Sequence, residues 1–159
     1  MKQFTFSIVV LIFSVIAVDA GTKIQQLKID STLPGRPVSL ASGDLNEDGV
    51  PDLVIGYAQI GHGSLAILLG NQQALLSHDT HIDPFLPGAR TIETPQSPDF
   101  IGVGDFNADS HLDIVVAQKG ANTLYWIPGN GKATSNKIIQ TKLNGNIDHL
   151  FTADMNRKD

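Results

Sequence analysis

Two short acidic segments with the same spacing of side chains dominate this sequence. The first, GDLNEDGVPDLVIG, spans residues 43–56, and the second, GDFNADSHLDIVVA, spans residues 104–117. Counted from its first aspartate, each has aspartate at positions 1, 5 and 9 and asparagine at position 3, and then becomes apolar. Carboxylates at this density repel one another unless something compensates their charge. Any fold of the chain must therefore hold the same arrangement of acids twice.

The oxygens of these two loops have the character of calcium ligands. Ca²⁺ takes six to eight hard oxygen ligands, including backbone carbonyls, in a flexible geometry. In the first loop, residues 44–52, the predicted ligands are the side chains of Asp44, Asn46, Asp48 and Asp52 and the carbonyl of Val50. In the second loop, residues 105–113, they are the side chains of Asp105, Asn107, Asp109 and Asp113 and the carbonyl of His111.

Position 6 distinguishes the two loops. Gly49 tolerates the positive φ that a sharp turn around an ion requires, whereas Ser110 at the same position adds backbone strain. We therefore expect weaker binding in the second loop.

Two alternatives to a calcium loop of this type have to be weighed. An EF-hand needs a bidentate glutamate at position 12 and a following helix, but position 12 is Ile55 or Val116 and a strand is expected next. Asp, Asn and Gly also make ordinary turns without metal. Turn chemistry alone gives no reason for aspartate at position 9, so the sequence predicts Ca²⁺ as the cofactor and leaves a metal-free turn as the alternative.

The apolar runs repeat together with the loops. Residues 53–55, 65–69, 114–116 and 123–127 are short and rich in branched side chains, which predicts strands. Residues 24–29 and 137–143 predict weaker strands, and no amphipathic helix is expected after residue 20. The aspartates that open the three copies are 61 and 49 residues apart, and we place the inserted residues around 78–98. Four-stranded units at such periods are typical of propeller blades. The predicted fold is all-β, with about two blades and the start of a third, an incomplete propeller.

These motifs resemble the FG-GAP/VCBS repeat family, which forms the calcium-loop blades of integrin α-chain propellers and of many secreted bacterial proteins. The resemblance runs through residues 40–71 and 101–131 and restarts at about residue 151. The third copy keeps Asp154 and Asn156 but has Lys158 at position 5. The resemblance implies a β-propeller with Ca²⁺ in loops between strands, used for adhesion or ligand display.

The N-terminus has the pattern of a secretory signal. Lys2 precedes an apolar run over 4–18, and Val18-Asp19-Ala20 provides small residues before a cleavage point. We predict a signal peptide at 1–20, a repeat region at 21–159 and a secreted or extracytoplasmic location, in the periplasm or at the cell surface. The run is short for a membrane span of about 20 residues, so no span is expected after cleavage. Because the sequence stops within a motif, a fragment of a longer protein is favoured over a truncated product or a self-assembling subunit.

Charge and missing motifs narrow the possible functions. The chain has 11 basic and 16 acidic residues and a net charge of −5, so a nucleic-acid partner is not expected. It has no cysteine, no Gly-x-Ser-x-Gly elbow and no His-Glu-x-x-His, and we predict no catalytic residues. His78 and His81 are assigned to a solvated loop rather than to a transition-metal site.

The leading hypothesis is a secreted calcium-binding module for adhesion or for binding a protein or carbohydrate ligand. The alternative is an accessory propeller of a secreted polysaccharide-active enzyme. Exposed strand edges make self-association possible.

Overall fold

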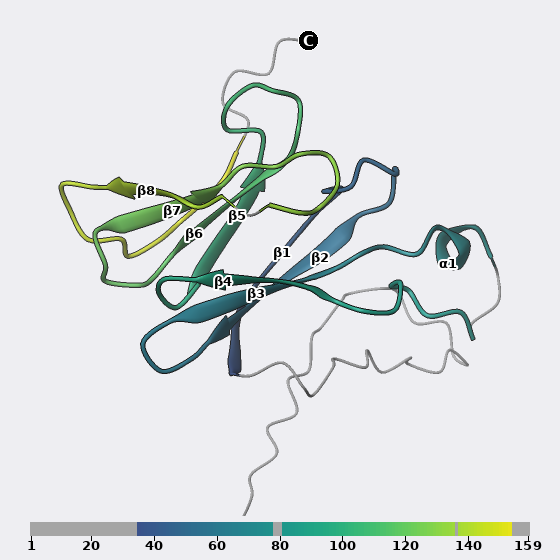
Figure 1. The fold of residues 1–159 in the computed structure, drawn as a ribbon, viewed down its shortest axis with the longest axis horizontal. Helices are drawn as coiled ribbons and strands as arrows, with labels where there is room; N and C mark the ends of the chain where they lie inside the picture. The colour runs from purple at the N-terminus through teal and green to yellow at the C-terminus, as the bar shows by residue number, and fades with distance from the viewer. Residues whose placement is uncertain (1–34, 78–80, 136, 154–159) are drawn as a thin grey trace, which may run out of the picture.

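Two antiparallel four-stranded sheets form the part of the chain that the structure describes (Figure 1). This computed structural model describes residues 35–77, 81–135 and 137–153. The first sheet has the strand order β1-β2-β3-β4 and the second β5-β6-β7-β8, so strands adjacent in sequence pair with each other. The elements are β1 (Arg36–Gly43), β2 (Asp52–Ala58), β3 (Gly63–Leu68), α1 (Gln72–Leu76), β4 (Arg90–Thr94), β5 (Phe100–Gly104), β6 (Asp113–Ala117), β7 (Thr123–Ile127) and β8 (Ile139–Lys142). The predicted all-β fold with four strands per repeat is confirmed.

Each acidic loop joins the first strand of its sheet to the second. The strands predicted after the loops are present as β2, β3, β6 and β7, and the weaker prediction at 137–143 is present as β8. The strands before the loops, β1 and β5, were missed, and so was β4, which lies within the range 78–98 where the inserted residues were placed. The sequences of β1 and β5, RPVSLASG and FIGVG, are rich in Ser, Gly and Pro, which weaken the strand signal. Pairing with the buried strands β2 and β6 supplies what local propensity does not.

The inserted residues lie between β3 and β4. Residues 69–89 separate these strands, whereas residues 128–138 separate β7 from β8. The insertion contains α1, a short helix that the sequence analysis did not predict; none of its residues is buried, so it does not contradict the expectation of no amphipathic helix. The helix has 5 residues, and the Asn71 side chain caps its N-terminus by accepting a hydrogen bond from Gln73 N at 3.1 Å. A single capped turn has no apolar periodicity for sequence analysis to detect.

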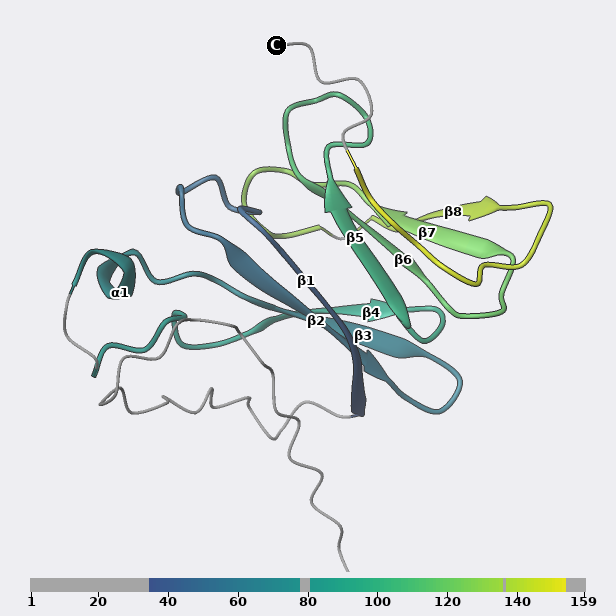
Figure 2. The same ribbon diagram turned by 180° about the vertical axis from the view of Figure 1, so that it is seen from behind.

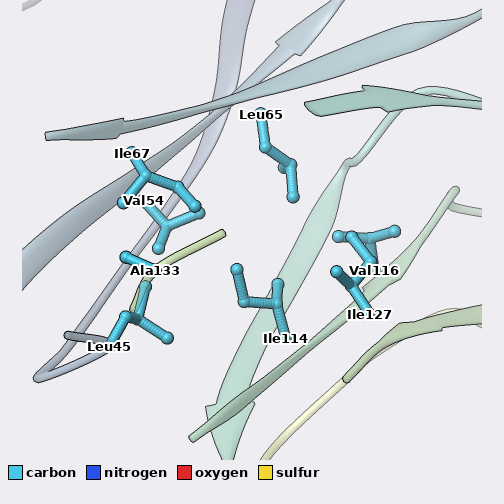
Figure 3. Packing of buried hydrophobic residues seen from close by; sticks show 8 residues of the cluster. All are labelled: Leu45, Val54, Leu65, Ile67, Ile114, Val116, Ile127 and Ala133. Atoms are coloured by element: carbon cyan, nitrogen blue, oxygen red, sulfur yellow. The ribbon is translucent and has the colours of Figure 1, made fainter. Parts of the chain in front are cut away.

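The main apolar core lies between the two sheets (Figure 3). Alternate residues of the first sheet, such as Val54, Leu65 and Ile67, face alternate residues of the second, such as Ile114 and Val116. The cluster comprises Leu45, Val54, Leu65, Ile67, Ile114, Val116, Ile127 and Ala133. Because both sheets contribute to one core, we expect them to unfold together.

The strands β1 and β5 approach each other closely. A Cβ added at Gly43, at the end of β1, would lie 2.7 Å from Val103 Cγ1 on β5. Residues 150–152 lie against β5 in a related way, since a Cβ at Gly102 would lie 2.3 Å from Thr152 Cγ2 (Figure 2). Residues 150–152, where the third sequence copy begins, therefore pack beside β5 of the second sheet.

Among the described residues, no helix is long and apolar enough to cross a membrane. The predicted signal at 1–20 and the strand predicted at 24–29 lie outside the described ranges.

Replacing Leu65 tests the core shared by the two sheets. Leu65 is fully buried in the cluster, so Leu65→Ala should lower the free energy of unfolding by about 2–5 kcal/mol, measured by urea denaturation. The matched control is Leu75→Ala on α1, where the side chain is 67% exposed and the expected change is within about 0.5 kcal/mol. Two separate unfolding transitions for the two sheets would contradict a shared core.

Candidate metal-binding loops

The first loop is organised by hydrogen bonds from its own backbone to the predicted ligands. Asp44 accepts from Asp48 N at 3.1 Å and from Gly49 N at 2.8 Å. Asn46 Oδ1 accepts from Asp48 N at 3.2 Å, and Asn46 Nδ2 donates to Asp48 Oδ2 at 2.8 Å. Asp48 Oδ1 in turn accepts from Val50 N at 2.9 Å. The side chains at positions 1, 3 and 5 are therefore all hydrogen-bonded to the same short stretch of backbone, residues 48–50.

The second loop repeats this pattern bond for bond. Asp105 accepts from Asp109 N at 3.2 Å and from Ser110 N at 2.9 Å. Asn107 accepts from Asp109 N at 2.9 Å and donates to Asp109 Oδ2 at 2.7 Å, and Asp109 accepts from His111 N at 2.9 Å. The identical spacing in the sequence thus corresponds to an identical local structure.

Two positions in each loop have the left-handed backbone conformation. At position 6, φ is +86° for Gly49 and +71° for Ser110, which confirms the expected strain at the serine. At position 4, φ is +59° for Glu47 and +61° for Ala108, a feature that the sequence did not reveal. A non-glycine residue in this region costs about 1–2 kcal/mol, so the second loop carries one more such cost than the first.

The aspartate at position 9 is a buried anchor in both loops. Asp52 is fully buried and accepts from Leu45 N at 3.0 Å and from Gly70 N at 2.9 Å. Asp113 is also fully buried and accepts from Phe106 N at 3.0 Å and from Gly129 N at 2.7 Å. Each carboxylate therefore links the start of its loop to the glycine that follows the third strand of the sheet. The inference that only a metal explains aspartate at position 9 was incomplete, because this anchor needs no metal.

Glycine is required where the chain returns to the loop. A Cβ added at Gly129 would lie 2.1 Å from the Leu112 carbonyl oxygen. A Cβ at Gly70 would lie 2.5 Å from Val50 Cγ1 and 2.7 Å from the Pro51 carbonyl oxygen. The Gly-Asn pair that recurs in both copies thus combines a close approach at Gly with a turn at Asn.

The loops perturb the ionisation of two aspartates in opposite directions. Burial raises the pKa of Asp52, the hydrogen bonds from Gly70 and Leu45 oppose this rise, and the charges of Asp48 and Asp44 reinforce it. The hydrogen bond from His111 N lowers the pKa of the exposed Asp109, with a smaller contribution from Asn107. Ionised Asp52 is therefore held at a cost that a nearby cation would reduce.

The donor set of each loop fits a hard cation by its chemistry. Every predicted ligand is an oxygen, and a carboxylate has about four lone-pair sites, so an oxygen that accepts one N–H retains capacity for an ion. Among the described residues, no group of three or more Asp, Glu or His side chains could hold a metal ion by itself. A site in either loop would therefore also need Asn46 or Asn107 and the carbonyl of Val50 or His111.

The two loops also contact each other. His111 Nδ1 of the second loop donates to Glu47 Oε1 of the first, and Ala133 N, in the β7–β8 connection, donates to the Leu45 carbonyl at 2.9 Å. This hydrogen bond with Glu47 is the main cause that raises the pKa of His111. The sequence analysis missed the role of Glu47. Positions 4 and 7 do differ between the copies, but so do positions 2, 6 and 8, so the sequence alone could not single out this contact.

The remaining sequence candidates do not join these loops. Tyr125 packs on the core between the sheets, whereas Trp126 pairs with Val115 and Ile139 on the other face of the second sheet, because adjacent residues of a strand point to opposite faces. His81 lies in the insertion, exposed, and His78 lies outside the described residues. The third-copy residues Asp154, Asn156, Lys158 and Asp159 also lie outside them.

Comparison with known protein families gives two matches. Residues 37–62, which include the first loop and β2, match the model of the FG-GAP repeat. Residues 105–157, from the second loop through β8, match the model of the FG-GAP-like repeat. No match was found among curated proteins or among solved structures.

Replacing Gly129 tests the anchor at position 9. Gly129→Ala should lower the free energy of unfolding by about 1–3 kcal/mol, because the added methyl group collides with backbone that cannot move aside easily. Gly145→Ala is the matched control, since a Cβ there meets nothing within 4 Å. Equal stabilities of the two variants in denaturant titrations would rule out the close approach.

The Glu47–His111 contact predicts a pH dependence. NMR titration in calcium-free buffer should give His111 a pKa above the usual value of about 6.5, and Glu47→Gln should lower it. The stabilisation from this pair is complete below the pKa of the unfolded histidine and is lost as the pH rises through the higher folded pKa. Glu93→Gln, which removes the partner of His62 instead, should leave His111 unchanged. A His111 pKa that does not respond to Glu47→Gln would show that the contact is absent in solution.

Proposed function

The chain carries repeats of the FG-GAP family, and on that premise we propose that it is a calcium-stabilised binding module with one Ca²⁺ in each acidic loop. FG-GAP repeats are β-propeller blades and generally take part in ligand binding or adhesion. The two sheets are therefore two blades, here called blade 1 (β1–β4) and blade 2 (β5–β8).

The observation that carries the proposal is the equivalence of the two loops. The same oxygens stand at positions 1, 3, 5 and 9, and the same hydrogen bonds orient them. The backbone donors are neutral, so they orient the carboxylates without removing their net charge. A divalent cation would both orient the carboxylates and compensate their negative charge. Hard oxygen donors suit Ca²⁺ better than a softer metal.

The role beyond calcium is binding rather than catalysis. We place the protein in a secreted or extracytoplasmic setting, on the strength of the signal pattern at 1–20, where millimolar Ca²⁺ is present. A protein or carbohydrate is the proposed ligand class, in line with the general role of the repeat family. Weak calcium sites suit this setting, because extracellular modules have dissociation constants of about 0.1–1 mM.

Thermal unfolding in EDTA, in 2 mM Ca²⁺ and in 2 mM Mg²⁺ tests the proposal. Linkage at these affinities contributes about 0.6–1.8 kcal/mol per site, which corresponds for two sites to a rise in Tm of several degrees for a domain of this size. The rise should be specific to Ca²⁺, because Mg²⁺ demands a stricter geometry. A folded chain with the same Tm in all three buffers would contradict calcium binding and show that the acidic loops are ordinary turns.

Variants of the two loops separate their contributions. Asp48→Ala should remove more of the calcium-induced rise in Tm than Asp109→Ala, because Ser110 weakens the second loop. Ser110→Gly should strengthen calcium binding in the second loop and raise the stability of the calcium-free chain by about 1 kcal/mol, because the greater freedom of glycine in the unfolded chain offsets part of the relieved strain of about 1–2 kcal/mol. Equal losses from the two alanine variants would contradict the ranking of the loops.

A further inference from the structure

We infer that the two acidic loops are coupled, so that an ion in the first loop tightens calcium binding in the second. The inference rests on the proposed calcium sites and adds their regulation. The three contacts that support it join blade 1 to blade 2 at the loops themselves.

The first contact is the hydrogen bond between Glu47 and His111. Glu47 stands at position 4 of the first loop, within one residue of the predicted ligand Asp48. His111 stands at position 7 of the second loop, where its own carbonyl is a predicted ligand. Their counterparts in the other copy are Ala108 and Val50, so this pairing can form in one direction only. The Glu47 carboxylate also lies over Gly131, where an added Cβ would come within 2.7 Å of Oε2.

The second contact is a chain of hydrogen bonds between the two buried anchors. Asp52 Oδ2 accepts from Leu45 N at 3.0 Å, and the Leu45 carbonyl accepts from Ala133 N at 2.9 Å. Four residues before Ala133, Gly129 N donates to Asp113 Oδ1 at 2.7 Å. The carboxylate that closes the first loop is thus linked through two short stretches of backbone to the carboxylate that closes the second.

The third contact is apolar packing beneath both loops. Leu45, at position 2 of the first loop, and Leu112, at position 8 of the second, line the same cavity of about 20 Å³ between the blades. A Cβ at Gly43, just before the first loop, would lie 3.1 Å from Leu112 Cδ1. Leu45 belongs to the buried cluster between the blades and Leu112 packs against the same cluster, so a shift of one leucine changes the packing around the other.

These contacts give the coupling its sign. An ion that orders the first loop fixes Leu45 and Glu47, and with them the partners Ala133 and His111 that border the second loop. The second ion then has less to order, which is positive cooperativity without any large structural change. Direct repulsion between the two ions acts in the opposite sense, but the loops are exposed and salt screens it at 0.15 M ionic strength.

The experiment measures calcium affinity loop by loop in the full chain at 0.15 M salt. NMR signals of the Gly49 and Ser110 amides report the first and second loop separately. Asp48→Ala silences the first loop and should weaken calcium binding in the second by about fivefold or more, the lower end of usual coupling factors. Asp109→Ala should weaken the first loop by the same factor, because coupling is reciprocal.

A second set of variants tests the route. The coupling factor, the ratio of second-loop dissociation constants with and without Asp48→Ala, should fall toward one when Glu47→Gln or His111→Ala is added. Glu93→Gln is the matched control, because Glu93 pairs with His62 within blade 1 at 3.7 Å and should leave the factor unchanged. Circular dichroism verifies the fold of each variant. Because Glu47→Gln and His111→Ala each remove the same hydrogen bond, the test can still be made if one of the two variants fails to fold.

The outcomes are distinguishable. Calcium binding in both loops with a coupling factor of one overturns the inference and leaves the proposed function intact. A factor that persists unchanged in both Glu47→Gln and His111→Ala overturns the assigned route. Absence of calcium binding in both loops overturns the proposed function, and the coupling with it.

Discussion

The buried carboxylate at position 9 organises each blade. Asp52 and Asp113 each accept two backbone N–H groups, one from the start of the loop and one from the glycine that follows the third strand. A fully buried carboxylate is tolerated when its oxygens are hydrogen-bonded in this way, and losing one donor would leave an unsatisfied buried charge. The anchor joins segments 16–18 residues apart, so it fixes the loop, the second strand and the return of the chain after the third strand in one arrangement.

The anchor also explains why the two blades pack as they do. By holding Leu45 N, Asp52 directs the Leu45 side chain into the core between the blades and leaves its carbonyl to accept from Ala133. The counterpart of Leu45 in blade 2 is Phe106, which is 45% exposed. Likewise Val54, Leu65 and Ile67 correspond by register to Val115, Leu124 and Trp126 on the far face of blade 2. The far face of blade 2 therefore carries apolar residues at the same positions as the face of blade 1 that is buried against blade 2.

Much of this arrangement was readable from the sequence, and what was missed has physical reasons. The repeated aspartates and the strands after the loops were predicted because each leaves a local pattern, whereas the insertion was placed around 78–98 and lies at 69–89, before β4. The strands β1 and β5 were missed because pairing and not propensity holds their Ser- and Gly-rich sequences in the sheet. The role of Gly129 required the distance to the Leu112 carbonyl, and the Glu47–His111 contact joins positions 64 residues apart. Such long-range contacts leave no spacing rule in a single sequence.

The backbone hydrogen bonds and the proposed cation would have complementary roles in these loops. Neutral N–H donors orient the carboxylates, but they leave the first loop with Asp44, Glu47, Asp48 and Asp52 and the second with Asp105, Asp109 and Asp113. A divalent ion can therefore still reduce the mutual repulsion of acids that the backbone hydrogen bonds have already oriented. The greater charge of the first loop and the glycine at its position 6 both favour tighter binding there. Contacts through which an ion in the first loop also orders the second loop would therefore strengthen calcium binding at the site that is weaker by itself.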